Sequence, residues 1–354
     1  MRIALISTPF LPVPPRDYGG TELVVHELAE GLAARGHAVT LYATGDSASP
    51  GTLHWLYPEA QWPPDPLVDL AHVSWALRAA GRGGFDIVHA HSPAALALAH
   101  VAPGLPLVYS IHHARDERLS RFYQHFLRPW YIAISADQLR HESPLPRMTV
   151  IHHGLDPARF EWSDRPADYV CFLGRLSRVK GPHTAIDVAA RAGLAIRLGG
   201  EAHPPDREFA RAEVEPRLRL PHVTYLGVVG GSAKIPLLRD ARALLAPIEW
   251  NEPFGLILIE AMLSGCPVVA FRRGSVPELV EHGVTGLVVD NAEQMAAVLR
   301  PGGPLDRLDR RRCRARAIQR FSRMRMVEDH ERLYARVTAD RAAARGLVVP
   351  TPAA

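Results

Sequence analysis

The stretch from residue 2 to residue 43 decides the class of fold. It begins with an aliphatic run, RIALIS at Arg2–Ser7, continues with ELVVHELAEGLAAR at Glu22–Arg35, and ends with AVTLYA at Ala38–Ala43. In the middle segment apolar residues recur every three or four positions, the spacing of an amphipathic helix, and Gly36 follows where such a helix would end. A strand, a helix and a second strand in this order predict a parallel sheet built from βαβ units.

The same alternation continues along the whole chain. Further strands are expected at Asp86–Ala90, Leu107–Ile111, Tyr131–Ser135, Thr149–His152, Tyr169–Leu173, Ala195–Leu198, Val223–Leu226, Ala243–Pro247, Pro267–Phe271 and Gly286–Val289. With 354 residues the chain is too long for one hydrophobic core, and Asp156–Asp168 is its natural linker. We therefore predict an α/β protein with two doubly wound, Rossmann-like domains, residues 1–160 and 161–320. A C-terminal helix and tail over 321–354 should pack back on the first domain. Such sheets bind ligands beyond the carboxyl ends of their strands, so two facing domains would form a cleft.

The composition is that of a globular protein, with 47% hydrophobic and 22% charged residues. No apolar run approaches the ~20 residues that span a bilayer, and Ile3–Ile6 is too short for a signal peptide. The three cysteines are far apart and odd in number, which suits a reducing cytosol and makes a poor disulfide framework. We therefore expect a cytoplasmic protein.

The net charge of +4 is modest, and many arginines lie late, in Arg307–Arg325. We interpret this cluster as a solvated helix face laced with acidic residues. No nucleic-acid partner is expected, and peripheral contact with an anionic membrane is left as the alternative.

The first motif, Tyr18-Gly19-Gly20-Thr21-Glu22, stands just before the first helix. A dinucleotide-binding turn would need G-x-G-x-x-G directly after the strand, so a nicotinamide or flavin dehydrogenase is disfavoured. Gly19 and Gly20 could still expose backbone N–H groups to an anion or a sugar hydroxyl, with Glu22 beside them. A plain turn is the alternative.

The second motif follows the strand Tyr169–Leu173 and reads G-R-x4-K-G from Gly174 to Gly181. Arg175 and Lys180 place two cations over the end of that strand. Two fixed cations can neutralise a diphosphate leaving group without a metal. Ordinary surface basic residues are the alternative.

The third motif, N-E-P-F-G-L at Asn251–Leu256, lies between a strand and a helix that begins near Gly255. The N-terminus of that helix offers free N–H groups and a positive dipole to a phosphate. Glu252 stands just outside it, where a carboxylate could accept bonds from sugar hydroxyls. Glu260 lies inside an otherwise apolar helix, where a ribose diol or a structural salt bridge would satisfy it.

These motifs together resemble the family 4 glycosyltransferases, whose GT-B fold has two Rossmann-like domains. The E-x7-E hallmark of the family is matched by Glu252 and Glu260. The resemblance extends over nearly the whole chain through Asp86–His91 and Gly274–Gly286, together with the two glycine-containing motifs. One departure is His153, where the family commonly has Asn before Gly-x-Asp.

The resemblance implies a role for each matching residue. His112, in the context Ser110-Ile111-His112, would lie against the transferred sugar, with His113 a weaker choice, and Glu252 would face the same sugar. The remaining expected contacts are Arg175, Lys180, Phe254, Gly255 and Leu256 for the diphosphate, Glu260 for the ribose, Gly227, Val229 and Lys234 more weakly for the base, and Gly19, Gly20 and Glu22 for an acceptor or phosphate loop.

The function implied is a retaining glycosyltransferase. It would move a hexose from a UDP-sugar or GDP-sugar to a hydroxyl acceptor, which could be a glycan, a lipid-linked molecule or a small molecule. Neither cofactor nor metal is expected. The resemblance implies a family that needs no metal, and His89, His91 and His152 stand on alternating strand positions and are not expected to converge. A hydrolysing sugar-nucleotide epimerase and a non-catalytic nucleotide-sugar-binding protein are the alternatives.

Overall fold

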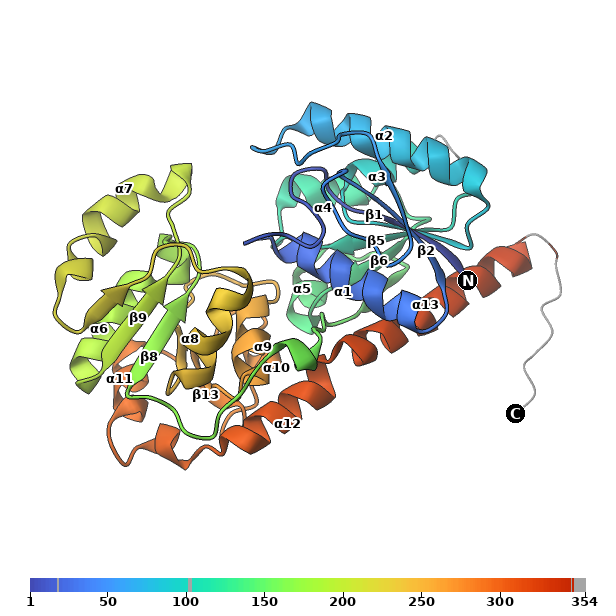
Figure 1. The fold of residues 1–354 in the computed structure, drawn as a ribbon. Coiled ribbons are helices and arrows are strands. Elements are labelled where there is room, and N and C mark those ends of the chain that lie inside the picture. The colour runs from blue at the N-terminus through green and yellow to red at the C-terminus, as the bar shows by residue number, and fades with distance from the viewer. Residues whose placement is uncertain (18, 101–103, 345, 347–354) are drawn as a thin grey trace. The chain divides into compact units, whose positions relative to one another are not determined.

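The computed structural model describes residues 1–17, 19–100, 104–344 and 346 (Figure 1). Tyr18 of the first motif and residues 347–354 of the expected tail lie outside the described residues. The chain forms two compact units. The first unit is Met1–Gly154 together with Arg323–Ala354, and the second unit is Leu155–Ser322.

The sheet of the first unit has seven parallel strands in the order β3-β2-β1-β4-β5-β6-β7. They are β1 (Arg2–Ile6), β2 (Ala38–Ala43), β3 (Thr52–Trp55), β4 (Ile87–Ala90), β5 (Leu107–Ile111), β6 (Trp130–Ala133) and β7 (Met148–Val150). The strand order reverses between the central strands β1 and β4, which makes this position the topological switch point. Sheets of this kind bind ligands there, beyond the carboxyl ends of the strands.

Helices cover the first sheet. They are α1 (Gly20–Ala34), α2 (Pro66–Gly83), α3 (Ala94–His100), α4 (Glu117–Tyr123), α5 (Ala136–His141) and the long C-terminal α13 (Arg323–Ala344). Figure 1 shows α13 alongside α1, and Gly31 is the reason for their close approach. A Cβ at Gly31 would lie 2.4 Å from a methyl carbon of Val327, so only glycine fits there. Arg323 on α13 also pairs with buried Glu27 on α1, Nε to Oε2 at 2.5 Å.

The sheet of the second unit has six parallel strands in the order β10-β9-β8-β11-β12-β13. They are β8 (Tyr169–Leu173), β9 (Ala195–Gly199), β10 (Val223–Tyr225), β11 (Leu244–Ala246), β12 (Val268–Phe271) and β13 (Gly286–Val289). Its helices are α6 (Pro182–Ala192), α7 (Arg207–Phe209), α8 (Lys234–Asp240), α9 (Leu256–Leu263), α10 (Val276–Leu279), α11 (Ala292–Leu299) and α12 (Arg310–Phe321). The predicted class, two doubly wound α/β sheets of the GT-B kind, is confirmed.

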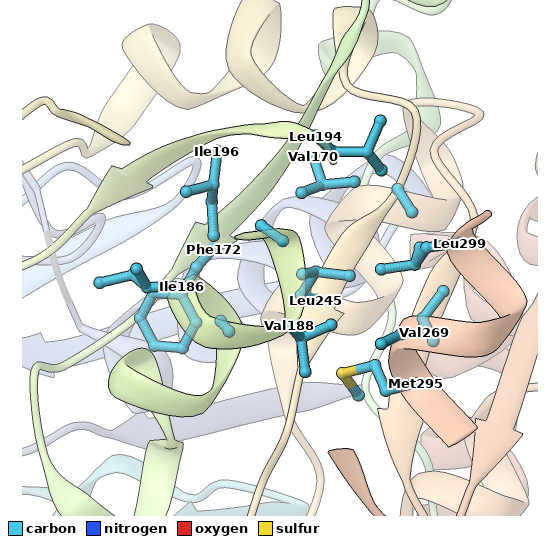
Figure 2. Packing of buried hydrophobic residues seen from close by; sticks show 14 of the residues in the cluster. Val170, Phe172, Ile186, Val188, Leu194, Ile196, Leu245, Val269, Met295 and Leu299 are labelled. Atoms are coloured by element: carbon cyan, nitrogen blue, oxygen red, sulfur yellow. The ribbon is translucent and has the colours of Figure 1, made fainter. Parts of the chain in front are cut away.

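The core of the second unit explains why its strands read as continuous apolar runs. Phe172 on β8 and Leu245 on β11 are buried between α6 and α11, which contribute Ile186 and Leu299 (Figure 2). Strands of a parallel sheet are covered on both faces, so their residues do not alternate between apolar and polar. This packing leaves the loops at the strand ends as the place for polar chemistry.

The arginine cluster differs from the predicted solvated face. Arg310 is 6% exposed, and its guanidinium donates to the carbonyl oxygens of Ser163 and Ala241. Arg314 and Arg320, also on α12, likewise donate to backbone carbonyls. Arginine suits this use because its planar fork supplies several donors in fixed directions. The prediction was therefore wrong for these three side chains, which secure loops of the second unit.

The structure also bears on the membrane and the cysteines. Within the described residues, no helix has the length and apolarity needed to cross a membrane. Each of the three cysteines is a buried free thiol.

Candidate active site

The loop after β8 is held against the loop after β11 by Gly181. This residue has φ +71°, and a Cβ on it would lie 2.3 Å from the carbonyl oxygen of Pro247. The backbone N–H of Glu249 donates to Val179 across the same contact at 2.9 Å. The close approach places the side chain of Lys180 beside the E-x7-E loop.

Glu252 is 6% exposed, and two neighbours hold its carboxylate. The ammonium group of Lys180 forms an ion pair with Oε2, and the indole N–H of Trp250 donates to the same oxygen at 2.8 Å. The ammonium nitrogen of Lys180 also lies 5.4 Å from the centre of the Trp250 ring, within the range of a cation–π interaction. Lys180, Trp250 and Glu252 therefore form one cluster, which we call the Lys–Trp–Glu cluster.

The backbone of Glu252 is positioned by the turn after β12. Gly274 has φ +51°, and a Cβ there would lie 2.4 Å from the amide nitrogen of Glu252. The N–H of Ser275 donates to the carbonyl of Glu252 at 3.0 Å, and its hydroxyl donates to that of Phe254 at 2.7 Å. Both contacts fix the loop immediately before α9.

Helix α9 begins at Leu256, as the sequence predicts, with Gly255 at φ +89° in the capping position. Within the described part of the chain no side chain caps this terminus. Its first N–H groups and the positive end of its dipole therefore remain available to an anion. Phe254 is buried and contacts the ring of Phe321 edge-on, so it can offer a ligand its backbone alone.

Glu260 is 4% exposed and forms an ion pair with Lys234, the first residue of α8. The structure thus brings a predicted ribose ligand and a predicted base-side residue together. Gly227, at φ +67°, accepts a hydrogen bond from Gly200 at 2.7 Å, and Val229 lies against Gly199. These two base-side candidates stand beyond the carboxyl ends of β9 and β10.

Arg175 has a partner that sequence reasoning missed. Its Nε lies 3.0 Å from Oδ2 of Asp206, which immediately precedes α7. Asp206 stands in no motif, and nothing in the sequence linked it to Arg175. The two predicted diphosphate cations, Arg175 and Lys180, are therefore each balanced by a carboxylate of the second unit.

In the first unit, Glu22 is a buried acid in the first turn of α1, 5% exposed. The hydroxyl of Thr8, just after β1, donates to its Oε1 at 2.5 Å. Burial raises the pKa of Glu22, and the Thr8 hydrogen bond opposes this shift. A Cβ at Gly19 would lie 3.0 Å from Oε2 of Glu22, so Gly19, Glu22 and Thr8 are brought together at the end of β1, with Gly20 as the first residue of α1.

His112 belongs to a cluster of imidazole rings that also contains His89 and His91, contrary to the expectation that these two histidines would not converge. The rings of His89 and His91 lie 4.4 Å apart, His91 and His112 5.0 Å, and His112 and His153 5.3 Å. Because parallel strands end at one edge of the sheet, β4 and β5 deliver these side chains to the same place. His330 on α13 completes the cluster, 5.5 Å from His89.

Burial favours the neutral form of each ring in the imidazole cluster. Burial, followed by repulsion from neighbouring histidines, lowers the pKa of His112 to about 3, and burial lowers that of His330 to about 4. The pKa values of His89, His91 and His153 fall well below the ordinary value for the same reasons. Among the residues that the structure describes, no group of three metal-ligating side chains is arranged to hold a metal ion.

With this geometry in hand, comparison with known proteins identifies the family. The model described as Glycosyltransferase Family 4 matches residues 18–159, and that of Glycosyl transferases group 1 matches 159–300. The chain belongs to the group 1, family 4 glycosyltransferases.

Each match to a known protein covers most of both chains. Glycogen synthase of Mycobacterium tuberculosis is 28% identical, over 81% of this chain and 82% of the relative. A solved glycosyltransferase involved in avilamycin A biosynthesis is 27% identical, with a TM-score of 0.72 over 96% of this chain and 98% of that one. The Anabaena protein HepE, solved with UDP and glucose, is 21% identical, with a TM-score of 0.74 over 95% and 100%.

In this glycosyltransferase the sequence named Lys180, Glu252, Lys234 and Glu260, but it did not show that they form two ion pairs or which other side chains contact them. Trp250 and Asp206 contact predicted residues in the second unit, and Thr8 and His91 do so in the first. Only His91 carried a signal in the sequence, through the Asp86–His91 motif. The predicted roles of the individual site residues stay predictions.

Proposed function

We propose that this glycosyltransferase moves a hexose, with retention of configuration, from a nucleoside-diphosphate sugar to a hydroxyl acceptor without a metal. The observation that carries the proposal is the Lys–Trp–Glu cluster beside the uncapped N-terminus of α9. It combines a cation and backbone N–H groups for a diphosphate with a carboxylate for sugar hydroxyls. HepE was solved with UDP-glucose, which makes UDP the first nucleotide to test.

Donor binding would exchange the partners of Lys180. A diphosphate carries more negative charge than one carboxylate, so its oxygens would compete for the ammonium group of Lys180. Glu252, still held by Trp250, would then accept hydrogen bonds from the hydroxyls of the transferred sugar. Arg175 would exchange Asp206 for the diphosphate in the same way, and Glu260 would accept bonds from the ribose beside Lys234.

Retention would follow from attack on the face that the diphosphate leaves. The bond from the anomeric carbon to the phosphate oxygen breaks, and a bond to the acceptor oxygen forms on the same face. The departing phosphate oxygen takes the acceptor's proton, while Lys180 and the N–H groups of α9 stabilise its charge. Because this attack needs no nucleophile from the protein, Glu252 would orient the sugar through its hydroxyls while Trp250 still holds its carboxylate.

The acceptor is proposed only as a hydroxyl compound. The relatives are involved in making products as different as glycogen and avilamycin A, so the family does not fix the acceptor.

The first experiment tests the donor and the absence of a metal together. UDP, GDP and ADP should be compared by thermal shift, followed by hydrolysis of the matching sugar nucleotides with and without EDTA. We expect one diphosphate to raise the melting temperature and turnover to survive chelation. Loss of turnover in EDTA, restored by Mg²⁺ or Mn²⁺, would contradict metal independence. Release of a sugar with inverted anomeric configuration, seen by NMR, would contradict retention.

A further inference from the structure

One hydrogen bond links His112 to a second histidine that has no assigned role. Nδ1 of His91 lies 2.8 Å from Nε2 of His112. His91 stands one residue beyond β4 and His112 one residue beyond β5, and these strands are paired neighbours. The backbone of the sheet therefore sets the distance between the two rings.

The ring of His91 is itself held in place. His89 lies against it at 4.4 Å, and both nitrogens of His89 are engaged: Nε2 with the hydroxyl of Ser110 at 2.8 Å and Nδ1 with that of Tyr334 at 2.8 Å. Tyr334 is fully buried on α13. The C-terminal helix thus supports the hydrogen bond between His91 and His112 through His89.

The tautomers follow from which nitrogens have partners. His91 is 5% exposed, and within the described residues its Nε2 atom is buried without a hydrogen-bond partner. A buried lone pair is left unpaired more often than a buried N–H, so the proton of neutral His91 belongs on Nδ1. Nδ1–H of His91 then donates to Nε2 of His112, which places the proton of His112 on its own Nδ1. Within the described part of the chain, Nδ1 of His112 has no hydrogen-bond partner. This atom is also not one of the buried polar atoms that lack a partner.

We propose that His91 is a positioning residue that holds the His112 ring and its tautomer, so that Nδ1–H of His112 donates to an oxygen of the transferred sugar. The proposal rests on the transfer of a hexose proposed above and on the role that the family resemblance implies for His112, which would lie against that sugar. It gives a reason for the second histidine of the Asp86–His91 motif, which the resemblance alone left without a task.

The test uses the full-length protein and three substitutions at one position. The amide of asparagine can place an N–H near the position of Nδ1, whereas that of glutamine reaches the position of Nε2. His91→Ala and His91→Gln should lower kcat by about 10- to 100-fold, the cost of a misplaced catalytic group, with little change in KM. His91→Asn should recover most of the turnover. His72→Asn, which removes another fully buried imidazole of the first unit, should lower the melting temperature and leave kcat unchanged.

A second measurement does not depend on activity. In protein labelled with ¹⁵N-histidine, the signals of His112, assigned by their loss in His112→Ala, should show a protonated Nδ1 in the wild type and in His91→Asn. They should show exchange between tautomers in His91→Ala. Wild-type kcat in His91→Ala, or one unchanged His112 pattern in all three variants, would overturn the proposal. If the pattern changes as expected but His112→Ala keeps full turnover, then the sugar-contacting role of His112 is wrong while its bond to His91 stands.

Discussion

The two units place different chemistry at the carboxyl ends of their sheets. The second unit has pairs of opposite charge, Lys180 with Glu252 and Lys234 with Glu260. The first unit has the imidazole cluster, in which His91 is hydrogen-bonded to His112, and His89 to the hydroxyls of Ser110 and Tyr334. Both arrangements are largely buried, so each must satisfy its polar groups within the protein when no ligand is present.

The difference matches two kinds of ligand. An ion pair can release its cation to a more strongly charged partner, which suits a diphosphate. A neutral imidazole held in one tautomer offers a directed hydrogen bond without attracting anions, which suits the hydroxyls of an uncharged sugar. The comparison therefore predicts that the two units respond differently to pH, to removal of charge and to nucleotide.

The largest effect should be that of pH on the first unit. Burial lowers the pKa of the five histidines of the imidazole cluster, so the unfolded chain binds protons near pH 6 that the folded unit does not. Stability must then fall as pH falls through the unfolded value, by about 1.4 kcal/mol per pH unit for each histidine. Burial raises the pKa of Glu22 and Asp69, so these acids act in the opposite direction, but they are two groups against the five histidines of the cluster.

Scanning calorimetry between pH 7 and pH 5 checks this prediction. UDP should raise the unfolding temperature of the second unit, which identifies its transition. The unfolding temperature of the first unit should fall more steeply than that of the second as the pH is lowered. His153→Asn introduces the residue that the family commonly has there. It should reduce the number of protons taken up on unfolding of the first unit by about one, and with it the dependence of stability on pH. Equal movement of both transitions would contradict the contrast between the units.

The next largest effect should come from removing the cations of the second unit. Lys180→Ala should lower kcat by about 100-fold, since loss of one electrostatic donor to a leaving group costs about 3 kcal/mol. Arg175→Ala should have a smaller effect in the same direction, because its partner Asp206 lies outside the Lys–Trp–Glu cluster. Both proteins should remain folded by circular dichroism. Wild-type turnover in both variants would place the diphosphate site elsewhere.

The two glutamates should separate nucleotide binding from catalysis. Glu260→Ala should lower the affinity for UDP by about tenfold, the cost of one or two hydrogen bonds. It should also lower the melting temperature, because Lys234 is left unpaired. Glu252→Ala should keep or increase the affinity for UDP, because it frees Lys180, yet lose turnover with the intact donor. Calorimetric titration with UDP and turnover measurements test both. Loss of UDP affinity in Glu252→Ala alone would reverse the two assignments.

Much of the fold could be predicted because buried parallel strands appear in the sequence as apolar runs between helical patterns. Of the predicted strands, all six in the second unit are confirmed, and among the described residues of the first unit β3 alone was missed. Thr52–Trp55 forms an edge strand with mostly exposed side chains, so it has no apolar run to reveal it. The arginines of α12 were misjudged for a related reason, since sequence alone does not show which loops a guanidinium can reach.

The site divides in the same way. Residues within motifs could be placed on loops at strand ends, as Lys180 and Glu252 were. Contacts between separate segments could not be derived, because spacing along the chain does not give distance in space. The imidazole cluster illustrates this limit: His91, His112 and His153 follow three different strands, yet the rings of His91 and His112 lie 5.0 Å apart and those of His112 and His153 5.3 Å. The proximity of His89 and His91 was misjudged instead, because residues two apart on a strand share one face.

The smallest effect should come from Trp250, which joins the two charges of the cluster without carrying one. Trp250→Phe keeps an aromatic face for Lys180 but removes the N–H that donates to Glu252. Losing one such hydrogen bond should cost about 1 kcal/mol, which is about fivefold in kcat/KM. Trp250→Ala removes the ring as well and should cost about 0.5–1 kcal/mol more. The decisive measurement is a double-mutant cycle with Glu252→Gln. If Trp250 acts by holding the carboxylate, the two losses in kcat/KM are less than additive. Full additivity would mean that the indole stabilises the loop and does not act through the carboxylate of Glu252.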